Sequence, residues 1–293
     1  MSRLAVAVLV TSFASPAFAD APIVGGTMDS NDPAVVLLAA YPANMSTLFT
    51  CSAVVVSPGH LLTAAHCLDH AGYTFGVYYG ADASAYSTLA ELAPQLSPIT
   101  AVHMYPGYQT ASPFEGDIGV VDLATPTAVT PLLFELSAPT ADLVNMPARI
   151  VGYGQTVYNT PNQVRYSATT IVASLDSGDT LLIGDATHRT CVGDSGGPAI
   201  YGGVVLGIDS YSDTTGCTDP SHFRRTDVYA AFIDTFAGTG VVADDLPVDM
   251  PTDAGTVTKP GSSSGCSTTN GGGAGLVVVG LAAVIARRRR ASR

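Results

Sequence analysis

Basic residues are scarce in this chain. Its 293 residues include 12 Lys and Arg against 24 Asp and Glu, so the formal net charge is -12. Lysine occurs once, at Lys259. A protein that binds nucleic acid neutralises phosphates with clustered cations, and this chain has few cations to cluster. The composition therefore argues against nucleic acid as a partner.

Charged residues of either sign are also few, at 12% of the chain, whereas 47% of the residues are hydrophobic. Disordered chains combine low hydrophobicity with high net charge, so wholesale disorder is excluded. The length allows one large domain or two small ones around a sizeable core. We find no internal repeat.

The first 19 residues have the organisation of a secretory signal peptide. Arg3 is an isolated early cation, residues 4–10 form an apolar run, and residues 17–19 (AFA) provide a small-residue exit. The alternative is a buried N-terminal helix, and Pro16 argues against it. We therefore expect residues 1–19 to be a signal peptide and the protein to be exported.

The other end of the chain changes character after the predicted folded part. Residues 241–265 are rich in Asp, Pro, Gly, Ser and Thr, which is typical of a flexible linker. Residues 266–293 begin at Cys266, continue through a Gly-rich and then an apolar segment, and end in a basic cluster. A helix over residues 271–286 would be about 24 Å long. The hydrocarbon core is roughly 30 Å thick, so this transmembrane helix would span it only marginally.

This tail resembles the C-terminal sorting signals of bacterial surface proteins, of the MYXO-CTERM and GlyGly-CTERM kind. The resemblance implies retention in the membrane, a tail-processing enzyme that acts near Cys266, and lipid attachment there. A simple C-terminal anchor is the alternative. Both interpretations place the folded domain outside the cytoplasm, either extracellular or at the cell surface of a bacterial envelope.

Cysteine usage agrees with export. Setting aside Cys266 leaves four cysteines, an even number, which predicts two disulfides in an exported domain. Counting alone allows three pairings, of which the local one, Cys51–Cys67 with Cys191–Cys217, closes loops of modest size. No Cys/His cluster has the spacing of a zinc site, and no segment reads as a calcium loop. We expect no bound metal.

Between residues 23 and 237 the sequence consists of short β-prone runs separated by Gly, Pro, Asn and Asp. This pattern predicts an all-β barrel or sandwich. Helical periodicity appears over residues 226–236, and residues 123–142 are predicted to cross between two halves. The predicted strands are Ala34–Ala40, Ser52–Ser57, Phe75–Tyr79, Ile118–Leu123, Arg149–Tyr153, Ala168–Ala173 and Ala199–Ile208.

The segment Gly193–Pro198, GDSGGP, is the most informative stretch. A serine flanked by glycines can lie on a tight turn that exposes its hydroxyl. Serine is a weak nucleophile and needs a base, for which histidine is suited near neutral pH. His66 follows an apolar strand and adjoins a predicted disulfide. The imidazole needs a buried carboxylate in turn, and Asp117 opens the apolar run 117–123. We therefore predict a Ser195–His66–Asp117 group.

Taken together in chain order, these motifs resemble those of the chymotrypsin/trypsin-like serine endopeptidases. The resemblance covers residues 23–240 and implies two six-stranded antiparallel β-barrels, a C-terminal helix and an active site between the barrels. Tryptophan is absent, so tyrosines stand where the family often has it. The matching segments are Ile23–Gly26, Cys51, the motifs of His66, Asp117 and Ser195, Val151–Gly154, Ser210–Ser212 and Phe223–Ile233.

The resemblance implies a hydrolase that cleaves peptide bonds through an acyl-enzyme. Ser195 would attack the carbonyl, His66 would transfer the proton and Asp117 would orient His66. The amides of Gly193 and Ser195 would form the oxyanion hole. The segment Ser210, Tyr211 and Ser212 would align substrate as an added strand. The implied partners are protein or peptide substrates without a cofactor, and we expect a monomer.

Activation of this chain departs from the family's pattern. In the family a new N-terminus, here Ile23, pairs with the acid before the serine, here Asp194, and this pair orders the oxyanion hole and the pocket. The residue before the new N-terminus is normally basic, but here it is Pro22. Residues 20–22 would be the short pro-segment of a zymogen. We expect a proline-tolerant or aminopeptidase-type activating peptidase.

The specificity pocket is also unusual. Arg189, six residues before Ser195, stands where the family has the floor of the primary pocket and where trypsins carry an acid. A guanidinium there would repel basic P1 side chains and could pair bidentately with a carboxylate. Cleavage after Arg or Lys is therefore not expected, and an acidic P1 residue is one possibility. Alternatively, Asp219 or Asp227 neutralises Arg189 and leaves a plain pocket.

The wall of this pocket depends on the alignment. One register places Ser221 on the wall, and a shifted register would place Asp227 there instead. Ser212 stands where glycine is common in the family and would narrow the entrance.

Two non-catalytic functions stay open. The chain could be a surface binding protein that retains the protease fold without turnover, which Pro22 and Arg189 favour. It could also be a structural surface protein that the tail displays. Retention of all three predicted triad residues favours the enzyme.

Overall fold

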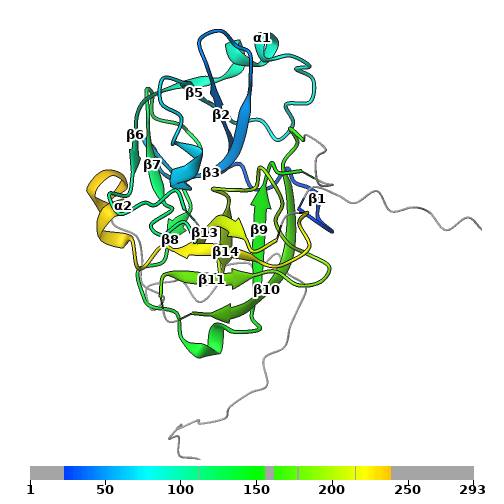
Figure 1. Ribbon diagram of the computed structural model, residues 1–293, viewed down its shortest axis with the longest axis vertical. Coiled ribbons are helices and arrows are strands. Elements are labelled where there is room, and N and C mark those ends of the chain that lie inside the picture. The colour runs from blue at the N-terminus through cyan, green and yellow to red at the C-terminus, as the bar shows by residue number, and fades with distance from the viewer. Residues whose placement is uncertain (1–22, 112, 156–161, 177, 215, 239–293) are drawn as a thin grey trace, which may run out of the picture. The chain divides into compact units, whose positions relative to one another are not determined.

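The computed structural model describes residues 23–111, 113–155, 162–176, 178–214 and 216–238 (Figure 1). Four predicted segments lie outside these residues: the signal peptide 1–19, the pro-segment 20–22, the linker 241–265 and the tail 266–293. Within the described ranges, none of the helices combines the length and apolar character that crossing a membrane requires.

The first half of the described chain forms a closed antiparallel barrel with strand order β2-β3-β4-β7-β6-β5. In β2 six consecutive residues, Val35 to Ala40, are buried. A strand covered on both faces reads as a continuous apolar run without alternation, which is what these residues show. The strands are β2 Val35–Tyr41, β3 Phe49–Ser57, β4 His60–Thr63, β5 Thr74–Tyr78, β6 Ser97–Met104 and β7 Gly119–Leu123.

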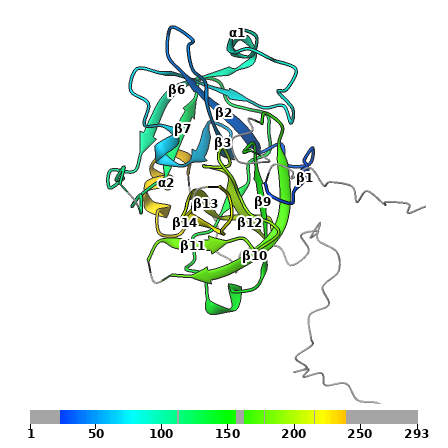
Figure 2. The ribbon, with the colours of Figure 1, turned by 45° about the vertical axis from the view of Figure 1, so that its right-hand side comes forward.

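The second half forms a second barrel. Strand β9 pairs with both β10 and β12, which closes the ring β9-β10-β11-β14-β13-β12. The two six-stranded barrels confirm the predicted fold class, and the two views show one above the other (Figures 1 and 2). The strands are β9 Pro147–Gly152, β10 Tyr166–Leu175, β11 Thr180–Ile183, β12 Pro198–Tyr201, β13 Val204–Ser212 and β14 Ser221–Arg225, with β1 Thr27–Met28 beside β10 and β8 Leu133–Phe134 parallel to β13.

The C-terminal helix α2, Ala230–Ala237, returns the chain from the second barrel to the first. Its Ile233 is fully buried and belongs to the same apolar core as the strands of the first barrel. The helix begins four residues later than predicted, because Thr226 is buried and its hydroxyl bonds to the carbonyls of Glu135 and Val205. The other helical segments are α1 Leu89–Leu92 and the 3-10 turns Ala65–Cys67, Ala93–Gln95 and Ala141–Leu143.

Sequence patterning found the long apolar strands and missed the short or polar ones. Strands β4, β6, β11 and β14 were not predicted, and β14 has the sequence SHFRR, which reads as exposed. The predicted run Ala199–Ile208 is two strands, β12 and β13, because Gly202 and Gly203 form a turn at positive φ.

Two disulfides fasten the segments that carry the predicted chemistry. They are Cys51–Cys67 and Cys191–Cys217, with Cα–Cα distances of 6.1 Å and 5.0 Å. This is the local pairing among the three that counting allows. The first disulfide joins β3 to the 3-10 turn of His66. The second joins the loop before Ser195 to the segment between β13 and β14.

A buried arginine connects the two barrels. Arg224 on β14 is 2% exposed, and its guanidinium forms an ion pair with Asp179 at 2.6 Å. The same guanidinium donates to the carbonyls of Pro113 and Phe114, in the loop of the first barrel that leads to Asp117. An arginine suits this position because its fixed fork of donors can serve several acceptors at once.

We predict that Arg224→Met lowers the free energy of unfolding by about 3–5 kcal/mol, because it leaves the Asp179 carboxylate without its cation. Equilibrium denaturation would measure the loss. The double variant Arg224→Met/Asp179→Asn should be less destabilised than the sum of the two single variants. A strictly additive double variant would contradict the pairing.

Candidate active site

Asp117 holds His66 in place. The Asp117 side chain lies just before β7 and is fully buried. One carboxylate oxygen accepts the backbone N–H of His66 at 2.8 Å, and the other lies 2.8 Å from its Nδ1. Ser210 on β13 donates its hydroxyl to that second oxygen at 2.6 Å. Because donors from both barrels hold the carboxylate, the imidazole has one fixed orientation, with Nε2 directed away from Asp117.

The loop of Ser195 is pressed against the first barrel. The Ser195 carbonyl accepts the N–H of Ser52 on β3 at 2.9 Å. The next residue, Gly196, has φ +82°, and a Cβ there would collide with the Thr63 hydroxyl and the Ser52 carbonyl. Glycine is therefore required for the loop to approach this closely.

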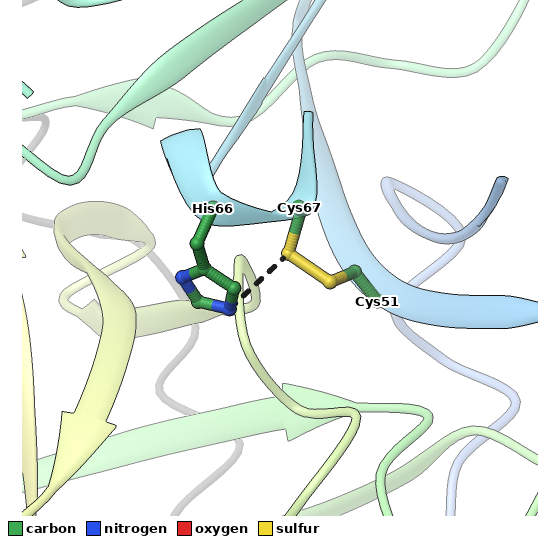
Figure 3. A group of neighbouring side chains, drawn as sticks. All are labelled: Cys51, His66 and Cys67. Carbon is green, nitrogen blue, oxygen red and sulfur yellow. Dashed lines mark hydrogen bonds between the residues drawn. A yellow bond between two sulfur atoms is a disulfide. The ribbon is translucent and has the colours of Figure 1, made fainter. Parts of the chain in front are cut away.

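His66 and Ser195 meet at the first disulfide. Nε2 of His66 lies 3.7 Å from Sγ of Cys67 (Figure 3), and the Ser195 carbonyl lies 3.7 Å from the same sulfur. Among the residues that the structure describes, no hydrogen bond joins Nε2 to the Ser195 hydroxyl. Hydrogen bonds of this kind are often long before substrate binds and tighten in the complex.

The sulfurs of Cys51 and Cys67 and a ring nitrogen of His66 lie within 4.8 Å of one another, a spacing that a metal could bridge. Zinc binds the deprotonated thiolate, however. Both sulfurs are consumed in the disulfide, so this group has only the imidazole to offer a metal.

The amides of Gly193 and Ser195 are the predicted oxyanion donors. Neither amide donates to a protein acceptor within the described ranges. The Ser52 hydroxyl accepts the N–H of Tyr153 at 2.9 Å and donates to the Gly193 carbonyl at 3.1 Å. Ser52 thereby fixes the orientation of the peptide that links Gly193 to Asp194.

Asp194 is buried, and no cation among the described residues forms an ion pair with it. Its oxygens accept the N–H groups of Gly154 at 2.8 Å and Cys191 at 2.9 Å. Burial raises the pKa of Asp194 to about 7, and these two hydrogen bonds offset part of the rise. Ile23 is fully buried in the core of the second barrel, and Val24 pairs with the strand-like segment at Arg189.

A cavity of about 210 Å³ opens beside Ser195. This is below the roughly 300 Å³ of pockets that hold drug-sized ligands, so the cavity suits a single side chain. A larger hollow of about 570 Å³ lies over β5 and β6 and does not include Ser195 or Asp117. The small cavity is lined in part by Thr190–Val192, Asp209–Ser212, Thr214 and Cys217.

Arg189 does not line this cavity in the part of the chain that is described. Its guanidinium donates to the carbonyls of Cys217 and Ala186, the latter at 2.7 Å. Asp227 is engaged elsewhere, in an ion pair with Arg225 at 2.6 Å. Arg189 thus donates to backbone carbonyls, and within the described ranges it forms no ion pair with Asp227 or Asp219.

Ser221 and Ser212 form a hydroxyl cluster behind the cavity. The Ser221 hydroxyl accepts from Thr190 at 2.5 Å and lies 2.8 Å from the Ser212 hydroxyl. Tyr211 presents a flat face beside it, because its ring stacks on His222 with centroids 4.3 Å apart. The segment Ser210–Ser212 thus lies at the end of β13, next to the cavity.

The sequence analysis overlooked two residues of the site. Asp209 is a single acid after the apolar run 204–208, and a lone charge in a buried strand was the available signal. Ser52 gave no signal, because its partner Gly193 is 141 residues away in the chain.

Comparisons with known proteins identify the family of the chain. The family profile described as Trypsin matches residues 29–233. Brachyurin of Leptuca pugilator is 26% identical over 206 residues, which cover 65% of this chain and 89% of brachyurin. Chymotrypsin-like elastase family member 1 of Bos taurus is 27% identical over 241 residues, covering 73% of this chain and 89% of the relative.

A solved structure described as "Structure of GrC" has a TM-score of 0.60 at 20% identity and covers 72% of this chain and 97% of that one. This likeness shows the shared fold. The chain therefore belongs to the trypsin family and is a serine endopeptidase.

The raised pKa of Asp194 predicts how stability changes with pH in the chain that still has residues before Ile23. The unfolded carboxyl ionises near pH 3.9, well below the folded value of about 7. Its contribution to stability is therefore complete below about pH 4 and is lost as the pH rises through 7. In a Ser195→Ala background, the unfolding free energy relative to Asp194→Asn should fall by about 3 kcal/mol between pH 4 and 8.

Chemical denaturation at a series of pH values would measure this difference. The exposed Asp142 offers a matched control, since Asp142→Asn should keep the pH dependence of the parent chain. A difference between parent and Asp194→Asn that does not change with pH would contradict the assignment.

Proposed function

We propose that the protein is an active, exported endopeptidase in which Ser195, His66 and Asp117 form the catalytic triad. The observation that carries this proposal is the doubly held Asp117 carboxylate, which leaves His66 one orientation and leaves Nε2 available for proton transfer. Two further observations support the proposal: a serine in a glycine-rich loop lies next to this group, and the chain belongs to the trypsin family.

In the first step the Ser195 oxygen forms a bond to the scissile carbonyl carbon while Nε2 of His66 takes the hydroxyl proton. The oxyanion accepts hydrogen bonds from the amides of Gly193 and Ser195. The C–N bond then breaks, and the protonated imidazole gives its proton to the departing amine. Water repeats the sequence on the acyl-enzyme and releases the carboxylic acid. Asp117 stays ionised and stabilises the imidazolium.

Substrate would lie along β13 as an added strand, with Ser210, Tyr211 and Ser212 beside it. The P1 side chain would enter the 210 Å³ cavity next to Ser195. Arg189 does not line that cavity among the described residues, and its guanidinium donates to the carbonyls of Cys217 and Ala186.

Activation would free the amino group of Ile23, and its ammonium would pair with Asp194. Two features support this step: Ile23 is already buried in the second barrel, and Asp194 has backbone donors but no ion pair with a described cation. Removal of residues 20–22 after Pro22 needs a proline-tolerant or aminopeptidase-type enzyme.

Export and surface display complete the proposal. Two disulfides within the described domain suit an oxidising compartment outside the cytoplasm. Residues 1–19 would direct export, and residues 266–293 would hold the domain at a bacterial envelope until a tail-processing enzyme acts near Cys266.

A fluorophosphonate probe tests the triad directly. Mature protein, sequenced to begin at Ile23, should be labelled at Ser195, and Ser195→Ala should abolish labelling. Asp117→Asn should slow peptide hydrolysis by about 10⁴-fold, the loss that this change causes in the family's template triad. Folded mature protein that the probe does not label would favour the non-catalytic binding protein.

A further inference from the structure

Asp209 is a buried acid at the cavity beside Ser195. It lies on β13, lines the cavity beside Ser195 and is 4% exposed. Its Oδ1 has no hydrogen-bond partner. Among the described residues, no Arg, Lys or His forms an ion pair with it.

Burial and two neighbouring acids make this carboxylate unfavourable as an anion. Desolvation raises the pKa of Asp209 well above its usual value, the charges of Asp194 and Asp117 raise it further, and hydrogen bonds from the Thr190 hydroxyl and the Ser210 amide offset part of the rise. A buried charge is tolerated when it is paired, and it is costly when it is not. Asp209 lines the cavity beside Ser195, so a cation that enters this cavity can approach the carboxylate.

The three buried acids of the site differ in the group that balances the negative charge of the carboxylate. Asp117 has the imidazole of His66 at 2.8 Å. Asp194 has the ammonium of Ile23 once the chain is activated, as proposed above. Asp209 has no comparable cation among the described residues, so a cation on the substrate is the partner that would pair with it.

The rest of the cavity offers acceptors for the N–H groups of a cationic side chain. Hydroxyls of Thr190 and Ser212 lie on its lining and can accept hydrogen bonds. Arg189 is held on the backbone carbonyls of Cys217 and Ala186. A guanidinium or ammonium on a flexible stem matches the volume, the acceptors and the charge of the cavity.

We propose that Asp209 is the specificity-determining residue of this endopeptidase and that it selects substrates with Arg or Lys at P1. This assignment rests on the proposed function, because it concerns the same active site. It reverses the P1 preference that Arg189 suggested in the sequence, and it places the selecting acid on β13, twenty residues away along the chain.

The experiment uses mature protein and peptide substrates that differ at P1 alone. Each cation is matched with a neutral analogue: Arg with its isostere citrulline, and Lys with norleucine, which has the four side-chain carbons without the ammonium. Cleavage after Arg or Lys should exceed cleavage after its neutral analogue by about 10²-fold or more in kcat/KM, because a desolvated charge pair is formed or lost. Asp209→Asn should remove most of that preference.

Matched variants separate the candidate charges. Asp213→Asn removes a nearby acid that is exposed and faces His222, so the preference should change by less than about 3-fold. Arg189→Gln should leave the preference for Arg and Lys in place. Preference for Glu at P1 that Arg189→Gln abolishes would overturn the proposal, as would equal cleavage after cations and their neutral analogues.

A binding measurement distinguishes this proposal from the triad itself. Benzamidine should slow fluorophosphonate labelling of the mature protein far more than the neutral benzamide does, and Asp209→Asn should reduce that difference. Labelled protein without any such difference would contradict the role of Asp209 and leave the triad standing. Absence of labelling in the parent protein would contradict the triad. The same labelling normalises Asp209→Asn to its correctly folded fraction.

Discussion

The site depends on burying the carboxylate of Asp117 where the two barrels meet. An isolated buried anion is unfavourable, so this one is held by the backbone and ring of His66 from the first barrel and by the hydroxyl of Ser210 from the second. The imidazole orientation therefore depends on the docking of the barrels. Arg224 reinforces that docking, since it bonds to the loop that leads to Asp117.

The chain has few cations, and this limits which groups can neutralise the buried acids of the site. A chain with a net charge of -12 buries three acids around one serine, and each needs a different compensating group. One has a histidine, the second is assigned the ammonium that activation creates, and the third is assigned the substrate. Maturation would thus neutralise the buried carboxylate of Asp194, and substrate binding would neutralise that of Asp209.

The extent to which sequence predicted these features follows from how local each signal is. Barrel strands such as β2 could be predicted because their own residues are apolar. The motifs of His66, Asp117 and Ser195 could be recognised because each is a short continuous run. Strand β14 was missed because Arg224 is buried through partners on other segments. The direction of the Arg189 side chain could not be read from the sequence for the same reason, because it depends on the carbonyls of Ala186 and Cys217. The position of Asp209 in the cavity could not be predicted, because the cavity is formed by segments that are far apart in the sequence.

The most direct test of the central claim is a structure of the mature protein after phosphonylation by a fluorophosphonate. The account predicts phosphorus on the Ser195 oxygen, a phosphonyl oxygen about 2.7–3.1 Å from the amides of Gly193 and Ser195, and Nε2 of His66 turned to the adduct with Nδ1 still on Asp117. An adduct on another residue would contradict it. So would an imidazole that has left Asp117 or remains out of reach of Ser195.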